Sequence, residues 1–300
     1  AVVSDRAWYG KGHSHPTFRD VVQKNIVVGA QERSATNLEA AFALYYVMGN
    51  STYSPGTGGE HTHVFTWQDL TVNDEALYTT FLEVMGSEYT KRLTGAWINS
   101  VTFTGNRNDH VVMSFEGGGR SYEDSTLPAP SSVSKASFFK TLYGKVWAGL
   151  GGGTIAEISC NVLSWTITIS QNVVPVFRMC NPSGEEMLVS KVNIGDQTVS
   201  GNVVIGIDAS YREAFLDQED VELEIICRSP DLISTNPHSL TFHIPVTKLS
   251  TEAFGEDEQE VTYTLTFDED SVLKGSGEHL EVTLVSDIDN SELGVVSQAL

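Results

Sequence analysis

The sequence predicts a mainly β protein, with two tandem antiparallel β-sandwich or barrel modules that each carry one short flanking α-helix. Two observations predict this fold class. Many short runs alternate apolar and polar residues and end at glycine, proline or asparagine, which is typical of strands with one buried face. Part of the sequence also occurs twice, about 150 to 177 residues apart, and this period is that of a domain.

The repeated segments pass from a β-branched run through a glycine into a helix-forming stretch. Residues 25–29 (Asn-Ile-Val-Val-Gly) are matched by residues 202–206 (Asn-Val-Val-Ile-Gly), and Glu-Ala-Ala-Phe or Glu-Ala-Phe follows in each copy. Two further pairs match along the chain: 93–104 with 239–245, and 110–116 with 261–268. A duplicated β module suggests pseudo-symmetry, and pseudo-symmetry suggests assembly.

In the first half, residues 21–29 predict a strand that ends at glycine. Thr36 and Asn37 predict the N-cap of a helix over 38–48, where apolar residues recur at helical spacing. Residues 50–59 are rich in serine and glycine and predict a mobile loop. The other predicted strands are 61–67, 69–72, 93–105 and 111–116, the last two forming a hairpin.

Residues 117–135 are rich in glycine, serine and proline and predict a linker. We therefore expect a first module over residues 1–128, a linker or exchanged arm over 129–153, and a second module over 154–300.

In the second module, residues 155–170 alternate strictly and predict a strand with one wet and one dry face. Residues 171–197 form a long polar stretch that predicts a loop, and such loops in compact domains are usually functional or disordered. A short helix is predicted over 208–215. The remaining predicted strands are 198–207, 221–227, 240–246, 260–268 and 279–286.

The chain is strongly acidic, with a formal net charge of −21. Residues 201–300 hold 21 of the acidic residues and only 4 basic ones. Because nucleic-acid binders neutralise phosphates with clustered lysine and arginine, this composition excludes tight DNA binding. It fits either simple solubility or a wall past which a polyanion slides without sticking.

The composition indicates a folded, soluble protein. No apolar run approaches the roughly 18 residues of a membrane span, so we expect no membrane insertion, and the first residues lack the pattern of a signal peptide. Cys160, Cys180 and Cys227 have no zinc-like spacing, and we expect reduced, mostly buried thiols.

Candidate chemistry is sparse. His13 with His15, and His61 with His63, have the i, i+2 spacing of some metal sites, but no third ligand is fixed, so a surface or interface role is favoured. The acidic clusters lack the spacing of a calcium-binding loop. No nucleophile elbow, phosphate-binding loop or zinc-protease motif is present. We assign no catalytic, cofactor-binding or metal-binding residue and expect neither an enzyme nor a cofactor.

The order of these elements resembles the tail tube (major tail) proteins of long-tailed bacteriophages. The best match is residues 95–105, Gly-Ala-Trp-Ile-Asn-Ser-Val-Thr-Phe-Thr-Gly, and the pattern extends over most of residues 20–285. In the second half it includes the strand 163–170, the long loop and the run 198–207.

The resemblance implies a structural virion protein of the tandem-duplicated tube-fold type. Such proteins form rings that stack into a hollow tail tube, through which DNA passes during genome delivery. It implies a virion location, assembly in the host bacterial cytoplasm, and contacts with the tape measure, tail terminator and tail tip proteins. We favour three chains per ring as a pseudo-hexamer, with six as the alternative. The loop 171–197 would bridge to the next ring, and the C-terminal acids would line or neighbour the DNA path.

One departure concerns the strand 154–170, which has no clear counterpart ahead of Asn25, because residues 1–20 predict a loop. Either the N-terminus shown is incomplete, or residues 136–150 or a neighbouring chain supply that strand.

Two other classes remain as alternatives. An extracellular tandem β-sandwich for adhesion or binding would be a monomer that forms no tubes. A metal-dependent enzyme would require the two His-x-His pairs to converge.

Overall fold

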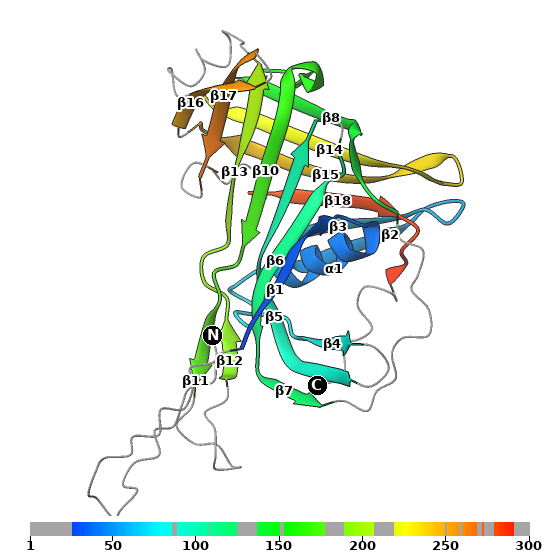
Figure 1. Ribbon diagram of the computed structural model, residues 1–300, viewed down its shortest axis with the longest axis vertical. Helices are drawn as coiled ribbons and strands as arrows, with labels where there is room; N and C mark the ends of the chain where they lie inside the picture. The colour runs from blue at the N-terminus through cyan, green and yellow to red at the C-terminus, as the bar shows by residue number, and fades with distance from the viewer. Residues whose placement is uncertain are drawn as a thin grey trace, which may run out of the picture.

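The computed structural model of the chain describes residues 26–85, 89–107, 109–124, 137–150, 153–177, 189–206, 219–249, 251–257, 260–268, 272 and 279–290. Its described part is mainly β, with antiparallel sheets and the α-helix α1, which confirms the predicted mainly β fold class (Figure 1). The predicted helix over 208–215 lies outside the described residues.

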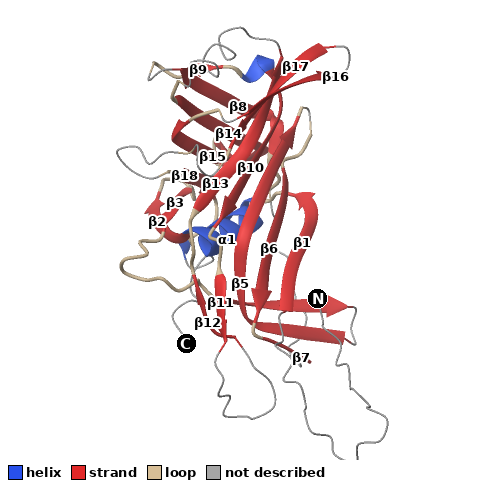
Figure 2. Cartoon of the chain, turned by 90° about the vertical axis from the view of Figure 1, so that its left-hand side faces the viewer, coloured by secondary structure: helices blue, strands red, loops and turns tan. Residues whose placement is uncertain are grey.

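The largest sheet has nine strands: β1 (Ile26–Ser34), β4 (Thr79–Met85), β5 (Tyr89–Asn106), β6 (Val112–Gly119), β7 (Ser121–Asp124), β10 (Val162–Ser170), β13 (Thr198–Gly206), β16 (Thr251–Asp257) and β17 (Glu260–Phe267). Its main path is β1-β6-β5-β10-β13-β17-β16, with β4 and β7 added along the first half of β5. Every pairing on this path is antiparallel. Figure 2 shows the main path face on, with α1 (Asn37–Met48) behind it.

The second sheet has seven strands: β2 (Gly49–Pro55), β3 (His61–Trp67), β8 (Lys140–Leu150), β9 (Ala156–Glu157), β14 (Val221–Ile233), β15 (Asn236–Thr247) and β18 (Glu281–Ser286). Its order is β2-β3-β18-β15-β14-β8-β9. A small third sheet pairs β11 (Val174–Phe177) with β12 (Val189–Asn193), and one 3-10 turn, η1, spans Ser159–Asn161.

The helix α1 forms where its capping residues predict it. The Glu39 backbone N–H donates to Thr36 Oγ1 over 3.2 Å, and Gly49 ends the helix at a φ of 82° with its N–H bonded to Tyr45 O. Most of its residues are buried, which fits a helix enclosed by sheets rather than one on the surface.

One hydrophobic core joins the two halves of the chain. The ring of Phe242, on β15, lies 5.0 Å from that of Phe103 on β5 and 6.0 Å from that of Trp165 on β10. Strands from both predicted modules also share both large sheets. The segment expected as a linker or arm contains β8, which pairs with β14. The division at residues 128 and 154 stays a prediction.

Several local expectations were wrong. The strand expected to end at Gly29 continues to Ser34 as β1, and the start of the strand expected over 155–170 forms β9 and η1 instead. Residues 50–55, expected as loop, form most of β2, because their hydroxyl side chains suit the solvent face beside β3. Residues 69–72, expected as a strand, form a turn in which Asp69 Oδ1 accepts from the Thr71 N–H. The glycine-rich start of the predicted linker completes β6 and forms β7. The predicted loop 171–197 contains the hairpin of β11 and β12.

The repeat is visible as two successions of strands. β1 is followed by α1, by the hairpin β2–β3 in the seven-stranded sheet, and by β5 and β6. β13 is followed by the hairpin β14–β15 in the same seven-stranded sheet and by β16 and β17. The counterpart of β5 is therefore β16, and the sequence match of 93–104 with 239–245 was wrong, because β15 lies in the other sheet. β8 also lies in that sheet, so residues 136–150 do not supply the strand missing beside β1.

Candidate assembly and channel surfaces

The outward face of the nine-stranded sheet is covered by short uncharged polar side chains. Along β10 the residues with odd numbers are buried, while the even-numbered ones lie on the open face. The strand pairings carry this alternation to the neighbouring strands. The resulting hydroxyl face consists of Ser100, Thr102, Thr104, Asn106, Ser114, Ser164, Thr166, Thr168, Ser170, Thr198, Ser200, Asn202, Thr264 and Thr266.

Side chains on this hydroxyl face bond to one another across the boundary between the two halves. Thr102 Oγ1 and Thr168 Oγ1 are 3.0 Å apart, and Thr104 Oγ1 and Thr166 Oγ1 are 3.4 Å apart. Cross-strand threonine pairs of this kind stabilise a sheet and hold the hydroxyl groups in place.

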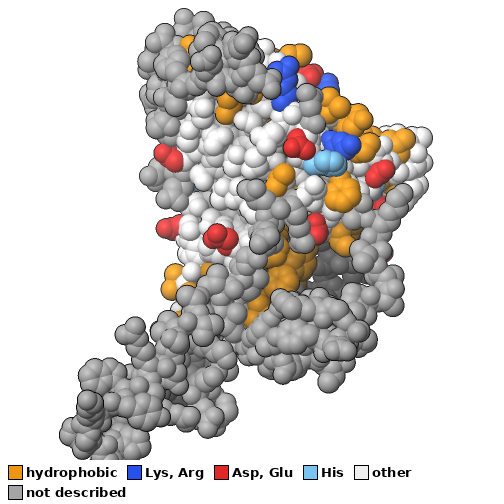
Figure 3. All heavy atoms as spheres, in the orientation of Figure 1, with side chains coloured by type: hydrophobic (Ala, Val, Ile, Leu, Met, Phe, Trp, Pro, Cys, Tyr) orange, Lys and Arg blue, Asp and Glu red, His pale blue; other side chains and the backbone are white. Residues whose placement is uncertain are grey.

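The hydroxyl face is almost uncharged. Besides the residues of this set, the described part of the same face on β5, β6, β10, β13 and β17 carries one charged side chain, Glu116, which is paired with Ser100. Figure 3 likewise shows a mainly uncharged surface over β10 and β13. Several acids of the C-terminal hundred residues instead lie on the seven-stranded sheet, such as Glu222, Glu224 and Glu281. Net charge alone did not indicate which face carries the acids.

Both ends of the nine-stranded path are open edges. In the described part of the chain, β1 pairs only with β6, and β16 pairs only with β17. Each edge therefore presents a row of backbone N–H and C=O groups, which commonly pair with another chain.

The hairpin β11–β12 projects away from the body as an arm (Figure 1). A small second core lies at its base, with Val189 and Val192 packed near Ala76 and Trp97. The chain enters the arm at Asn172, whose φ is 42°, and leaves it at Gly195, where an added Cβ would lie 2.4 Å from Asn172 O. Only glycine fits at that close approach.

Arg120 fastens the arm to the body. Its Nε donates to Val189 O over 2.7 Å and its Nη2 to Ser190 O over 2.8 Å. The guanidinium also lies 5.8 Å from the ring centre of Tyr78, and Tyr78 Oη accepts from the Val192 N–H over 2.8 Å. These contacts join the arm to two segments of the first half of the chain.

Tyr78 stays neutral at physiological pH. Burial, and then a hydrogen bond from its hydroxyl to Glu75 Oε1 over 2.8 Å, raise the pKa of Tyr78 to about 12. The neutral hydroxyl can therefore donate to Glu75 and accept from Val192 at the same time. Sequence analysis did not single out Arg120 or Tyr78, since neither belongs to a motif.

The histidines of the predicted pairs have structural contacts where they are described. His61 Nδ1 lies 2.9 Å from Tyr53 Oη, and the fully buried His63 has Nε2 2.9 Å from Ile288 O. His13 and His15 lie outside the described residues. Within the part of the chain that the structure describes, no three histidine, cysteine or acidic side chains gather as a metal site.

A second buried histidine joins segments that are distant in sequence. His238 Nε2 lies 3.3 Å from Ser137 Oγ, and its Nδ1 lies 3.8 Å from Asp287 Oδ1. Asn37 Nδ2 donates to the same Asp287 oxygen over 3.0 Å. Serine, histidine and aspartate are also the residue types of a hydrolase triad. Ser137 and His238 are almost fully buried, however, so the cluster holds distant segments of the chain together.

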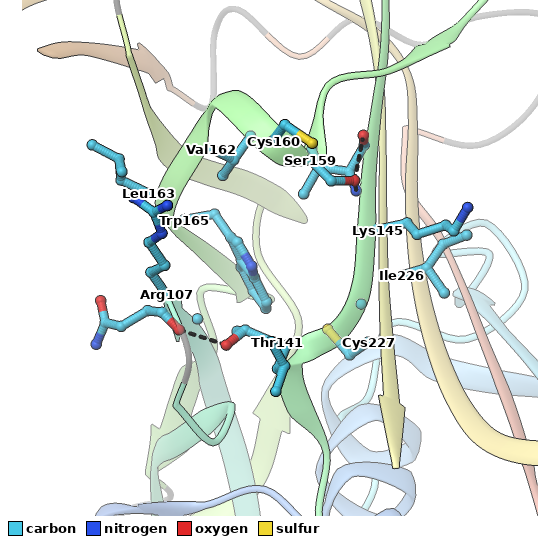
Figure 4. A pocket seen from close by; sticks show the side chains of 15 residues that line it. Arg107, Thr141, Lys145, Ser159, Cys160, Val162, Leu163, Trp165, Ile226 and Cys227 are labelled. Atoms are coloured by element: carbon cyan, nitrogen blue, oxygen red, sulfur yellow. Dashed lines mark hydrogen bonds between the residues drawn. The ribbon is translucent and has the colours of Figure 1, made fainter. Parts of the chain in front are cut away.

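The cysteines differ in exposure. Cys227 is buried, which raises the pKa of its thiol, whereas Cys160 is exposed and Cys180 lies outside the described residues. Cys160 and Cys227 line a pocket of about 200 Å³ together with Arg107, Thr141 and Trp165 (Figure 4). The pocket opens beside β8, and its lining also includes Lys145 and Ser159, which are both bonded to Glu157.

A comparison of the sequence with protein-family models identifies its family. Residues 31–268 match the family described as phage tail tube protein. The chain belongs to the phage tail tube protein family. It is thus a structural component of the virion tail, of a family that assembles into a tube with other tail proteins and is not enzymatic.

A comparison with curated protein sequences gave no match. Among the described residues of this tail tube protein, no helix has the length and apolarity needed to cross a membrane.

Proposed function

We propose that copies of this chain close into rings, that the rings stack into the hollow tail tube, and that viral DNA passes through the bore during delivery. The observation that carries the proposal is the nine-stranded sheet, which runs through both halves of the chain, is open at both edges and has a nearly uncharged outward face. In this proposal the chain is a structural subunit of the tube wall and not an enzyme.

Ring closure supplies partners for both open edges. The two edges are different strands, β1 at one end of the sheet and β16 at the other. A contact between β1 of one copy and β16 of the next is therefore head-to-tail. Such contacts form a closed ring when the rotation from one copy to the next is a whole fraction of a full turn. A closed barrel leaves no edge for unwanted pairing.

Strand direction supports one further strand at each junction. Six antiparallel steps separate β1 from β16, so these two strands run in the same direction and could pair directly only in parallel. In the second module, β10 precedes β13 in the chain and pairs with both β13 and β5. By analogy, we propose that one further strand lies between β1 and β16 of the neighbouring copy, and that a neighbouring chain supplies it.

The size of such a barrel favours three chains per ring. With strands about 4.8 Å apart and a tilt of about 36°, which lies in the usual range for β-barrels, roughly 24 strands from three chains would enclose a barrel about 45 Å across between backbones. Six chains would double this to about 90 Å, a bore several times wider than a single duplex needs.

The hydroxyl face suits the inner wall of this tube. Clustered lysine or arginine would hold the phosphates, whereas hydroxyl groups offer only neutral, hydrated contacts. The one charged side chain found on the described face, Glu116, repels phosphate. DNA can therefore slide without being retained.

The arm formed by β11 and β12 extends beyond the body and would contact the neighbouring ring in the stack. The attachment of the arm through Arg120 supports this role, because an arm that contacts the next ring must hold that ring at a fixed position relative to its own. The tape measure, terminator and tip proteins would meet the exposed ring faces, during assembly in the host cytoplasm.

Negative-stain electron microscopy of concentrated purified protein tests the proposal. We expect tubes or rings with a central hole and threefold averages. A protein that stays monomeric at every concentration and salt condition, also with a tail-tip initiator, contradicts it.

A further inference from the structure

A turn beside the base of the arm carries a highly exposed apolar side chain. Val72 is 83 % exposed, and its backbone N–H donates to Asp69 O over 3.0 Å. We call residues 69–73 the basal turn. A single exposed aliphatic side chain is ordinary on a protein surface, so the surroundings of Val72 decide what it could do.

Hydrogen bonds hold the basal turn against the base of the arm. Gln68 Nε2 donates to Asn73 O over 2.7 Å, and Gln197 Nε2 donates to Gln68 O over 3.2 Å. Gln197 directly precedes β13, whose first residue, Thr198, pairs with Ser170 at the end of β10. The basal turn therefore lies at the end of the sheet where β10 ends and β13 begins.

The surface around the basal turn has an excess of acids. Asp69, Asp74 and Asp196 are exposed there, and Lys191 bonds to Asp74 over 2.9 Å. Glu75 and Arg120 are also near the base of the arm and offset each other in charge. The described side chains at this end of the sheet thus carry a net negative charge.

The pocket beside β8 lies at the opposite end of the same strands. Its lining includes Arg107, just after β5, and Leu163 at the start of β10, and the Arg107 N–H donates to Leu163 O over 2.9 Å. Ser164, which pairs with Asn106, and Ser170 are six residues or roughly 20 Å apart along β10. The pocket and the basal turn are therefore separated by about the length of β10.

The pocket has an apolar wall large enough for an aliphatic side chain. Leu142, which is 62 % exposed, lines it together with Val162 and Trp165 (Figure 4). Its volume of about 200 Å³ is several times the ~30 Å³ that a water molecule occupies in the liquid. A branched side chain from another molecule can therefore enter it.

Positive charge predominates around the pocket. Arg107 and Lys145 line it, and Lys140 and Arg228 are paired on the adjoining strands β8 and β14. Lys145 bonds to Glu157 over 2.8 Å, whereas the Arg107 guanidinium has no ion pair with the described residues. Asp109 is a second acid close by. The four basic side chains outnumber these two acids on a chain whose net charge is −21.

We propose that the basal turn of a chain in one ring docks in the pocket of a chain in the next ring, with Val72 against Leu142 and Trp165 and the acids facing Arg107. The docking rests on the proposed stack of rings and names a second copy as the partner. Because barrel strands tilt by about 35–45° from the axis, the two ends of β10 lie at opposite rims of a ring, and stacking brings opposite rims together.

The opposite charges of the two surfaces also set the direction of stacking. A contact between two pockets would bring cations together, and a contact between two basal turns would bring carboxylates together. Both arrangements are repulsive, so the rings can stack only with the same polarity along the tube.

A substitution at Val72 tests the docking. Val72→Lys should fold as wild type by circular dichroism and form rings, but tubes should grow at least about tenfold more slowly, because a cation then meets Arg107 and Lys145. Adding Arg107→Glu should restore growth by supplying an opposite charge. Leu232→Lys is the matched control, because Leu232 is 61 % exposed on the hairpin of β14 and β15, and it should assemble normally.

A disulfide link gives a second measurement on assembled tubes. Cys160 is exposed and lines the pocket, so tubes of Val72→Cys should form disulfides between chains on mild oxidation, and Cys160→Ser should abolish them. Such a bond requires Cα atoms within about 7 Å. Within one chain the two positions lie at opposite ends of β10, so the link must join two chains.

The outcomes separate the docking from the proposed function. If wild-type protein forms tubes and Val72→Lys forms them at the same rate, the docking is wrong and the tube stands. Tubes of Val72→Cys without a link that depends on Cys160 also overturn the docking, and this result decides if Val72→Lys fails to fold. A wild-type protein that forms neither rings nor tubes contradicts the proposed function instead.

Discussion

Thr102 Oγ1 lies 3.0 Å from Thr168 Oγ1, and this contact joins a strand of the first half of the chain to a strand of the second. It stands in the middle of the hydroxyl face, so the proposed inner wall of the tube is continuous across the internal repeat. The sheet fixes the positions of both side chains. Substitutions at Thr102 and Thr168 can therefore test what the inner wall of the tube contacts.

Placing lysine at both positions, Thr102→Lys and Thr168→Lys, should leave tube assembly intact but slow DNA passage. Each added cation can contact phosphate, and the binding of DNA should then fall with salt with a slope of about −0.9 per contact. DNA release from reconstituted virions at several salt concentrations measures the effect. Lysine at Thr241, which lies on β15 in the other sheet, is the control. Equal release from both variants would show that the hydroxyl face does not meet DNA.

Replacing Arg120 by alanine should loosen the arm without unfolding the body. The change removes two hydrogen bonds from a charged donor, worth roughly 1.5–3 kcal/mol each where they are shielded from water. We expect faster hydrogen exchange in β11 and β12, rings that still form, and shorter tubes. Arg120→Lys should recover part of the effect. Tubes of normal length from the alanine variant would exclude the arm from stacking.

Replacing Phe242 by alanine should destabilise both halves together. Its ring contacts Phe103 and Trp165 across the two sheets, and loss of a buried phenylalanine costs about 3–5 kcal/mol. Chemical unfolding of monomeric protein, followed by fluorescence and circular dichroism, should give one transition at lower denaturant concentration. Two separate transitions, of which only one moves, would mean that the halves fold independently.

The fold should lose stability in mild acid. Burial lowers the folded-state pKa of His238 and of His63 below the value of about 6.5 in an unfolded chain. The unfolded chain then binds more protons, so this stability is complete above pH 6.5 and is lost as the pH falls through the folded pKa values. Thermal unfolding between pH 8 and 5 measures it. His238→Gln should flatten the profile, and an unchanged profile in that variant would contradict the assignment.

The sequence predicted the elements whose local pattern is strong. The alternation of Leu163, Trp165 and Ile167 with hydroxyl residues indicated β10, and the Thr36 cap indicated α1. The match of β1 with β13 and of β6 with β17 also agrees with their places in the sheet.

Other features depend on contacts far apart in the sequence. β16 and β8 carry glycine and charged residues and become strands only because β17 and β14 pair with them. The anchor at Arg120 is made with backbone oxygens 69 and 70 residues away, which no local pattern reveals. The composition gave the excess of acids but did not indicate that Glu222, Glu224 and Glu281 lie on the seven-stranded sheet.

A cryo-electron-microscopy reconstruction of assembled tubes tests the central claim most directly. The account predicts rings of three chains, with the nine-stranded sheets joined around the bore and Thr102 and Thr168 facing it. Rings in which the seven-stranded sheet lines the bore, or in which β1 and β16 remain unpaired at the surface, would contradict it.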